Sequence, residues 1–182
     1  TTMLPTLLTP RLRLRPLDEA DVPALFALFS NPTALRFWGH APFASLSEAE
    51  ALVQEAHEHA RAGTNLRWGV ERKDAPGQLI GTGSLYAVVR EHRRCEVGFI
   101  LSPDVWGHGY GREVVPALIE HAFSALQLHR LEADVDPRNI ASLRTLERCG
   151  FRREGYQRGR YHLGGEVQDS VLLGLLRDDP LT

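Results

Sequence analysis

A glycine-dense segment that follows an apolar run is the feature that most limits how this chain can fold. Glycines occupy positions 107, 109 and 111, after an apolar run over residues 97–101 and before an amphipathic stretch that extends to about Leu126. This order predicts a strand, a tight turn and the N-terminus of a helix. Because glycine has no Cβ atom, the backbone N–H groups of such a turn can converge on a phosphate, and the helix macrodipole favours negative charge there. The segment therefore predicts a phosphate-binding site.

The rest of the sequence predicts one mixed α/β domain. Alternating or short apolar runs bounded by turn residues predict strands over residues 12–15, 67–71, 79–89, 96–101, 131–135, 151–162 and 167–176. Apolar residues at helical spacing predict helices over residues 18–30, 47–62, 109–126 and 139–149. The turn residues Gly164 and Gly165 join the last two strands as a hairpin.

Particular residues are expected to begin or distort these helices. Asp18 and Asn139 are expected N-caps, and Ser47 with Glu50 forms a capping-box pattern at the start of the second helix. Pro116 lies inside the third helix, where it removes one backbone hydrogen bond. We expect a kink or a local widening of the helix at that proline.

Length, charge and cysteine content exclude several classes of protein. The 182 residues are expected to form a single domain, 1–182, and the net charge of −2 gives no strong field for nucleic acid or an anionic membrane. No apolar run has membrane length, and no signal-peptide pattern is present. Cys95 and Cys149 form neither a metal-ligand spacing nor a disulfide framework. We expect a cytoplasmic protein without metal, nucleic-acid or membrane partners, as a monomer or homodimer.

Three kinds of phosphate loop could use the glycine turn. A Walker P-loop ends in Gly-Lys-Ser/Thr, and no lysine is present here. A Rossmann fingerprint needs a third glycine where this chain has Arg112, and it belongs near the start of a βαβ repeat rather than past mid-chain. The third possibility is the pyrophosphate of coenzyme A.

The turn resembles the acetyl-CoA loop of the GNAT N-acetyltransferase superfamily, Gln/Arg-x-x-Gly-x-Gly/Ala. Residues 106–111, Trp-Gly-His-Gly-Tyr-Gly, match that pattern except at Trp106. This tryptophan, the opening segment 9–15 and Asn139-x-x-Ser142 leading to Gly150-Phe151 resemble the branch of the ribosomal-protein N-terminal acetyltransferases. The resemblance covers essentially the whole chain. It implies a single-domain GNAT fold, with a mixed, mostly antiparallel central sheet of six to seven strands flanked by about four helices.

The resemblance also implies the reaction and the coenzyme contacts. A primary amine attacks the thioester of the cosubstrate acetyl-CoA directly, with no acetyl-enzyme. In this family the strand before the glycine loop splays from its neighbour, and its free N–H groups hold the pantetheine and the carbonyl, an oxyanion-type arrangement. The implied coenzyme-binding residues are Phe99, Ile100, Leu101, Gly107, His108, Gly109, Tyr110, Gly111, Arg112, Asn139 and Ser142.

Glu96 is the first choice for the general base. It shares a strand face with Gly98 and Ile100 because side chains alternate along a strand, so its carboxylate can face the cleft. The alternative is a solvated or ion-paired carboxylate beside Arg93 or Arg94.

The leaving thiolate presents a departure from the family pattern. Many members carry a tyrosine as general acid where this chain has Leu146, and the ribosomal branch implies Ser142 as the substitute. A thiol with a pKa of roughly 8.5 leaves as thiolate with little help. Ser142 therefore either assists the sulfur or caps its own helix, and Asn139 either contacts the coenzyme or is only an N-cap. Cys149 is expected to fill the core rather than act as a nucleophile.

The acceptor pocket is expected to form from two segments. One contains Phe37 and Trp38 within residues 37–40, and the other is the strand over residues 156–162 with Arg158 and Tyr161. The alternative is that the aromatic residues pack the core and the arginines form a solvated face. The predicted acceptor is a protein or peptide N-terminal α-amine. Two alternatives stay open: a small-molecule amine such as an amino acid, polyamine or aminoglycoside, or a non-catalytic acyl-CoA-binding module.

Overall fold

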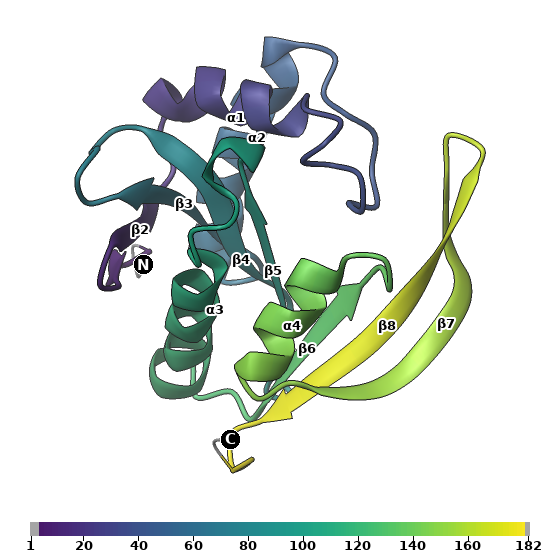
Figure 1. Cartoon of the computed structure of the whole chain (residues 1–182). Helices are drawn as coiled ribbons and strands as arrows, with labels where there is room; N and C mark the ends of the chain where they lie inside the picture. The colour runs from purple at the N-terminus through teal and green to yellow at the C-terminus, as the bar shows by residue number, and fades with distance from the viewer. Residues whose placement is uncertain (1–3, 181–182) are drawn as a thin grey trace.

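An open sheet forms the centre of the computed structural model, which describes residues 4–180 (Figure 1). Within these residues the sheet has eight strands in the order β1-β2-β3-β4-β5-β6-β8-β7. Their bounds are β1 Leu7–Leu8, β2 Leu12–Pro16, β3 Leu66–Arg72, β4 Leu79–Val89, β5 Arg94–Leu101, β6 Arg130–Val135, β7 Arg152–Leu163 and β8 Glu166–Leu176. The expected count of six to seven strands was low by one, because the two-residue strand β1 is too short to leave a pattern in the sequence.

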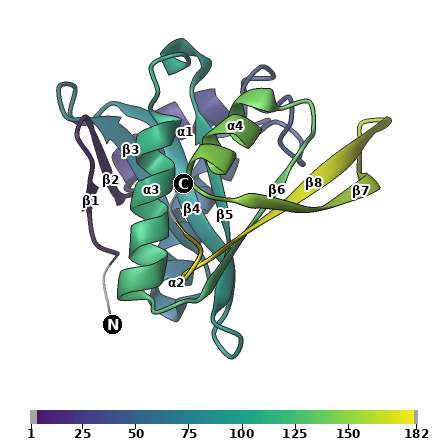
Figure 2. The same cartoon turned by 60° about the horizontal axis from the view of Figure 1, so that its bottom comes forward.

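Four α-helices cover the two faces of the sheet. They are α1 Val22–Phe29, α2 Leu46–Ala62, α3 Gly111–Glu120 and α4 Ile140–Arg148. Figure 2 shows α3 and α4 on one face and α1 and α2 on the other. The chain is therefore a three-layer α/β structure, and the expectation of a mixed α/β domain with about four flanking helices is confirmed.

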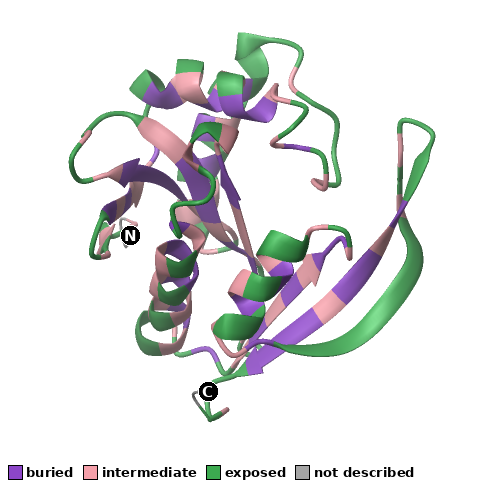
Figure 3. Cartoon of the chain, viewed as in Figure 1, coloured by how far each residue is buried: buried purple, intermediate pink, exposed green. Residues whose placement is uncertain are grey.

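A separate apolar core lies under each pair of helices. The core beneath α3 and α4 contains the fully buried Trp68 and Leu118, and the core beneath α1 and α2 contains Leu25, Phe29 and Ile100. In Figure 3 the buried residues lie on the sheet-facing sides of the helices, whereas β7 is exposed along nearly its whole length. The sheet is thus fully covered in its middle and bare at the β7 edge.

Two expectations about helix geometry were wrong in detail. Helix α2 begins at Leu46 with Ser45 as N-cap, and the Glu48 carboxylate accepts the Ser45 N–H at 3.1 Å, so the capping box lies two residues before the predicted one. Helix α3 stays α-helical through Pro116, and the widening is a π-helical turn over His121–Ala125. The missing N–H of a proline costs one hydrogen bond without forcing a change of pitch at that residue.

A cluster of buried ions joins β2, β3 and the turn before α1. Arg15 donates to Asp21 at 2.8 Å and to Glu71 at 2.8 Å, and Arg13 donates to Glu71 at 3.1 Å. The side chains of Asp21 and Glu71 are 3% and 4% exposed. The backbone N–H of Gly77 also donates to Glu71, so this carboxylate fixes the β3–β4 turn.

The strands β5 and β6 diverge, and this positions the site. They form the one parallel pair among the described strands, and they pair only at three positions, from Arg94 with Arg130 to Glu96 with Glu132. Beyond Glu96 the β5 residues 97–101 pair with β4 but have no strand on their other side. The backbone edge of β5 is therefore open where the family resemblance implied a splayed strand.

Candidate active site

The glycine turn leaves a run of backbone donors free. Gly107 and Gly109 have φ values of 81° and 76°, a region in which a side chain is strained. Within residues 4–180, none of the N–H groups of residues 107–111 donates a hydrogen bond to protein. Helix α3 starts at Gly111, the last of these five donors, so its positive dipole end adds to them. The turn has the character of an anion cradle.

Neighbouring side chains hold this turn in place. The Trp106 Nε1–H donates to the Leu101 carbonyl at 2.9 Å, and the Arg11 guanidinium donates to the His108 carbonyl at 2.8 Å. The Glu113 carboxylate accepts the Arg11 N–H and the Thr9 hydroxyl, both at 2.8 Å. Desolvation acts to raise the pKa of Glu113, but these bonds outweigh it and keep the pKa low, so the carboxylate is charged and held away from the cradle.

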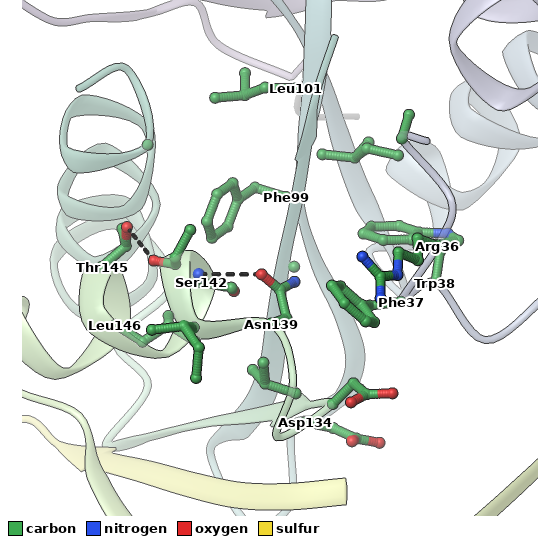
Figure 4. Close-up of a pocket in the computed structure, with 18 of the residues that line it drawn as sticks. Arg36, Phe37, Trp38, Phe99, Leu101, Asp134, Asn139, Ser142, Thr145 and Leu146 are labelled. Carbon is green, nitrogen blue, oxygen red and sulfur yellow. Dashed lines mark hydrogen bonds between the residues drawn. The ribbon is translucent and has the colours of Figure 1, made fainter. Parts of the chain in front are cut away.

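Helix α4 presents its first turns to the same space (Figure 4). Asn139 is the N-cap, as predicted, and its side-chain oxygen accepts the Ser142 N–H at 3.3 Å. The Ser142 hydroxyl makes no hydrogen bond within residues 4–180, whereas the Thr145 hydroxyl is engaged by the Ala141 carbonyl at 2.9 Å. Leu146 lines the cavity, so the wall is apolar at the position where the family resemblance implied a tyrosine as general acid.

One cavity of about 850 Å³ joins the cradle, the open edge of β5 and helix α4. The predicted residues that line it are Phe37, Trp38, Phe99, Ile100, Leu101, Gly107, Gly109, Tyr110, Gly111, Arg112, Asn139, Ser142 and Tyr161. The predicted residues Glu96, His108 and Arg158 do not line it. The structure therefore brings together most of the residues named from sequence, from five different parts of the chain.

The segment between α1 and α2 closes the far side of the cavity. Phe37 stacks with the guanidinium groups of Arg36 and Arg138, whose Cζ atoms lie 4.8 and 5.2 Å from its ring centroid. A Cβ atom at Gly39 would lie 3.4 Å from the Tyr161 ring, so this segment meets the β7–β8 hairpin closely. Phe37 and Trp38 form a cavity wall here, and Trp38 also packs against the core beneath α1 and α2.

The three carboxylates of the cavity wall all accept hydrogen bonds from other parts of the protein. Asp134 accepts hydrogen bonds from Tyr161 and Ser170 and an ion pair from Arg160 at 3.1 Å. Asp136 is paired with Arg138, and Asp169 accepts the Tyr156 hydroxyl and a backbone N–H. Asp134 and Asp136 are therefore paired with arginines, whereas Asp169 is held, among the described residues, only by neutral donors and keeps its negative charge.

Glu96 lies beside this wall rather than in it. It is level with Tyr86 on β4 and Glu132 on β6, and it takes part in no ion pair among the described residues. Burial, followed by the nearby charges of Glu132 and Asp134, raises the pKa of Glu96 above its usual value. A carboxyl group with a raised pKa is a stronger base than an ordinary one. The Tyr86 ring lies over Gly98, two residues further along β5, where an added Cβ atom would be 3.1 Å from the ring.

Several lining residues were not singled out from the sequence, among them Arg67, Ser84, Tyr86 and Asp134. Period-two alternation was a usable signal for Asp134, because its neighbours Ala133 and Val135 are buried on the opposite face. No comparable signal existed for the first three. Strand pairing across three strands, which a single sequence does not reveal, brings them to the cavity.

Other reactive side chains are inert by position. Burial raises the pKa of the Cys95 thiol to about 12 and also raises the pKa of Cys149. Within residues 4–180, no group of three or more His, Cys, Asp or Glu side chains is arranged to hold a metal ion, and no helix is long and apolar enough to span a membrane.

Comparison with known proteins gives the family. Residues 11–152 match the model of the acetyltransferase (GNAT) domain. The chain belongs to the GNAT acetyltransferase family. It is 35% identical over 175 residues to the uncharacterized N-acetyltransferase YoaA of Bacillus subtilis, a match that covers 96% of this chain and 98% of its relative.

Solved GNAT structures of two kinds share the fold. The spermidine N-acetyltransferase of Vibrio cholerae, in complex with CoA and spermine, is 27% identical with a TM-score of 0.83 over 94% of this chain and 98% of that one. RimL, the ribosomal L7/L12 α-N-protein acetyltransferase in complex with coenzyme A, is 22% identical with a TM-score of 0.86 over 97% and 100%. This chain is therefore an acyltransferase with the GNAT fold, and its fold is similar to that of enzymes with different acceptors.

Proposed function

We propose that this protein transfers the acetyl group of acetyl-CoA to a primary α-amine. The observation that carries the proposal is the set of five free N–H groups over residues 107–111, four of which belong to residues that line the same cavity as the unpaired edge of β5. Such a cradle suits the pyrophosphate of coenzyme A, and the open β5 edge lines the same cavity, where it could take the pantetheine arm. Acetyl-CoA supplies the activated acetyl group, and the protein supplies binding, orientation and proton transfer.

The residues named from sequence divide these tasks. The backbone of Phe99, Ile100 and Leu101 would hold the carbonyl oxygen and the pantetheine, with Asn139 as a further coenzyme contact. The unengaged Ser142 hydroxyl would donate to the departing sulfur. Glu96 would accept the proton of the attacking amine through a water molecule, since its side chain does not reach the cavity itself.

The pattern of charges favours an α-amine over a polyamine as the acceptor. A polyamine carries several ammonium groups and needs several free carboxylates, whereas two of the three aspartates of the cavity wall, Asp134 and Asp136, are already paired with arginines, and of the three only Asp169 has no cationic partner within residues 4–180. An α-amine has a pKa near ~8, against ~10.4 for an alkyl amine such as that of lysine, so it also needs less help to lose its proton.

A thiol-release screen with acetyl-CoA tests the proposed function. The acceptors are N-terminal peptides, amino acids, polyamines and aminoglycosides at equal concentration. We expect release with α-amines and the weakest release with spermidine. Tight acetyl-CoA binding without thiol release for any amine would favour the non-catalytic acyl-CoA-binding module instead.

Replacing Glu96 by glutamine tests the proposed base. We expect kcat/KM to fall by about 10²- to 10⁴-fold near neutral pH. The loss should shrink above about pH 8, where the α-amine is already neutral. In the wild type, activity should rise with pH through the raised pKa of Glu96, because the base works only when ionised.

Glu132→Gln is the matched control for this experiment. It removes a charge that raises the pKa of Glu96, so the acid limb of the pH profile should move to lower pH while the activity at higher pH stays the same. Full activity of Glu96→Gln over about pH 6 to 9 would show that another group, or water alone, takes the proton.

A further inference from the structure

A second cavity adjoins the first one on the face of the sheet that α2 covers. It has a volume of about 490 Å³ and lies between helix α2 and the strands β3 and β4. Four residues line both cavities: His40, Arg67, Ser84 and Tyr86. The space beyond the β5 edge therefore extends towards α2 and is larger than an amine alone requires.

Strand register places Arg67 in line with the reaction centre. Arg67 is paired with Ser84, and Ser84 is paired with Gly98 on β5. All three side-chain positions face α1 and α2, because the alternate residues of these strands are buried in the opposite core. Two strand spacings separate the Arg67 and Gly98 backbones, which is about 10 Å.

The Arg67 guanidinium has no hydrogen-bond or ion-pair partner within residues 4–180, although the side chain is mostly buried. Its Cζ atom lies 5.9 Å from the centroid of the Phe29 ring, which stacks against a cation without satisfying its N–H donors. Glu55 on α2 is the nearby carboxylate, and it does not reach ion-pair distance. Burial lowers the pKa of Arg67 by removing water from its charged form, so an anion here would replace lost solvation.

We propose that Arg67 binds a carboxylate of the acceptor and so selects amines that carry one. This rests on the proposed function, and it names the acceptor class more narrowly. A guanidinium presents a planar fork of donors that matches a carboxylate, and one positive charge balances one carboxylate. The same buried cation opposes a polycationic acceptor such as spermidine.

Two acceptor sources share this chemistry. One is a free amino acid, which carries its own α-carboxylate. The other is a peptide N-terminus with an acidic side chain in its first two residues. The span of about 10 Å between the backbones, part of which the arginine side chain fills, admits both.

Matched acceptors measure the contribution of Arg67. In the peptide arm, Ser-Glu and Ser-Gln peptides differ by one carboxylate and have the same N-terminal residue. In the amino-acid arm, glutamine is compared with glutamine amide at equal concentrations of neutral amine. The wild type should prefer the acid member of at least one pair by about 10- to 100-fold in kcat/KM, mainly through KM.

Variants of Arg67 should remove the preference and not the reaction. Arg67→Met should bring kcat/KM for the acid down to that for its uncharged partner, with acetyl-CoA affinity unchanged. Arg67→Lys should retain part of the preference, since it keeps the charge without the fork. Arg61→Met removes an exposed arginine of α2 that lines neither cavity, and it should change nothing.

The outcomes separate this inference from the proposed function. If no amine releases thiol, the proposed function is wrong and this inference falls with it. If amines are acetylated but no acid is preferred to its uncharged partner, only the inference is wrong. An equal loss on both members of every pair in Arg67→Met and Arg67→Lys would also overturn it, because the arginine would then be structural.

Discussion

A valine at position 109 is expected to abolish acetyl-CoA binding. Gly109 has a φ of 76°, which a β-branched residue adopts only with strain, so the turn must change shape. The five free N–H groups of residues 107–111 would then point in other directions. We expect the dissociation constant for acetyl-CoA to rise by at least about 100-fold, a loss of roughly 3 kcal/mol, by calorimetric titration.

Gly77→Val provides the control for the backbone strain. Gly77 has a φ of 84° in the β3–β4 turn, and an added Cβ there meets nothing within 4 Å. This variant should lose stability through the same strain and keep its affinity for acetyl-CoA. Unchanged affinity in a folded Gly109→Val protein would mean that the coenzyme binds elsewhere.

Loss of Glu71 is expected to cause the largest fall in stability. Glu71→Ala leaves Arg13 and Arg15 without this partner and removes the acceptor of the Gly77 N–H. Breaking a buried ionic network by removing one member costs about 3–5 kcal/mol. We expect a fall of that size in the free energy of unfolding, measured with urea.

The same substitution should change how stability depends on pH. Desolvation acts to raise the pKa of Glu71, and the bonds from Arg15, Gly77 and Arg13 outweigh it, so the folded-state pKa lies below the usual value. A carboxyl group with a lowered folded pKa stabilises the protein above its unfolded pKa of roughly 4.3, and this contribution disappears as pH falls through the folded value. Glu71→Ala should therefore show a weaker loss of stability on acidification below that pH.

Asp74→Ala is the control for charge removal. Asp74 pairs with Arg72 at 2.6 Å on the surface, where its side chain is 69% exposed. Exposed pairs contribute little, so this variant should unfold close to the wild type. If Glu71→Ala and Asp74→Ala lost equal stability, the buried ion cluster would contribute no more to the free energy of unfolding than an exposed ion pair does.

The sequence was sufficient where local patterns determine the structure. The glycine turn, the Asn139 cap and the four helices follow from residues close together in the chain, and all lie where they were expected apart from small shifts in helix ends. Period-two alternation placed Glu96 on one face of β5 with Gly98 and Ile100, but it did not predict that the Tyr86 ring would lie over Gly98 on that face or that Glu96 would not line the cavity. That arrangement depends on the β4–β5 register.

Arg67 illustrates what the sequence could not provide. In the amino-acid sequence Arg67 is one arginine among many. It lies in a strand that contributes Trp68 and Val70 to the core. Its place in the cavity depends on the pairing of Arg67 with Ser84 on β4 and of Ser84 with Gly98 on β5. Its role in the proposal also depends on the absence of a partner on α2. Such features depend on contacts between distant segments, which periodicity does not record.

The short ladder between β5 and β6 has a consequence for assembly of the molecule. Strands β1 to β5 and strands β6 to β8 each come from one continuous stretch of chain, so each half-sheet can form largely from local pairings. The glycine turn belongs to the first half, whereas Asp134, α4 and Tyr161 belong to the second. A bound coenzyme would contact both halves and would therefore stabilise their association by mass action. The stability of the folded protein should then rise with the fraction of molecules that hold the coenzyme. During synthesis, the cavity cannot exist until the second half has emerged and docked.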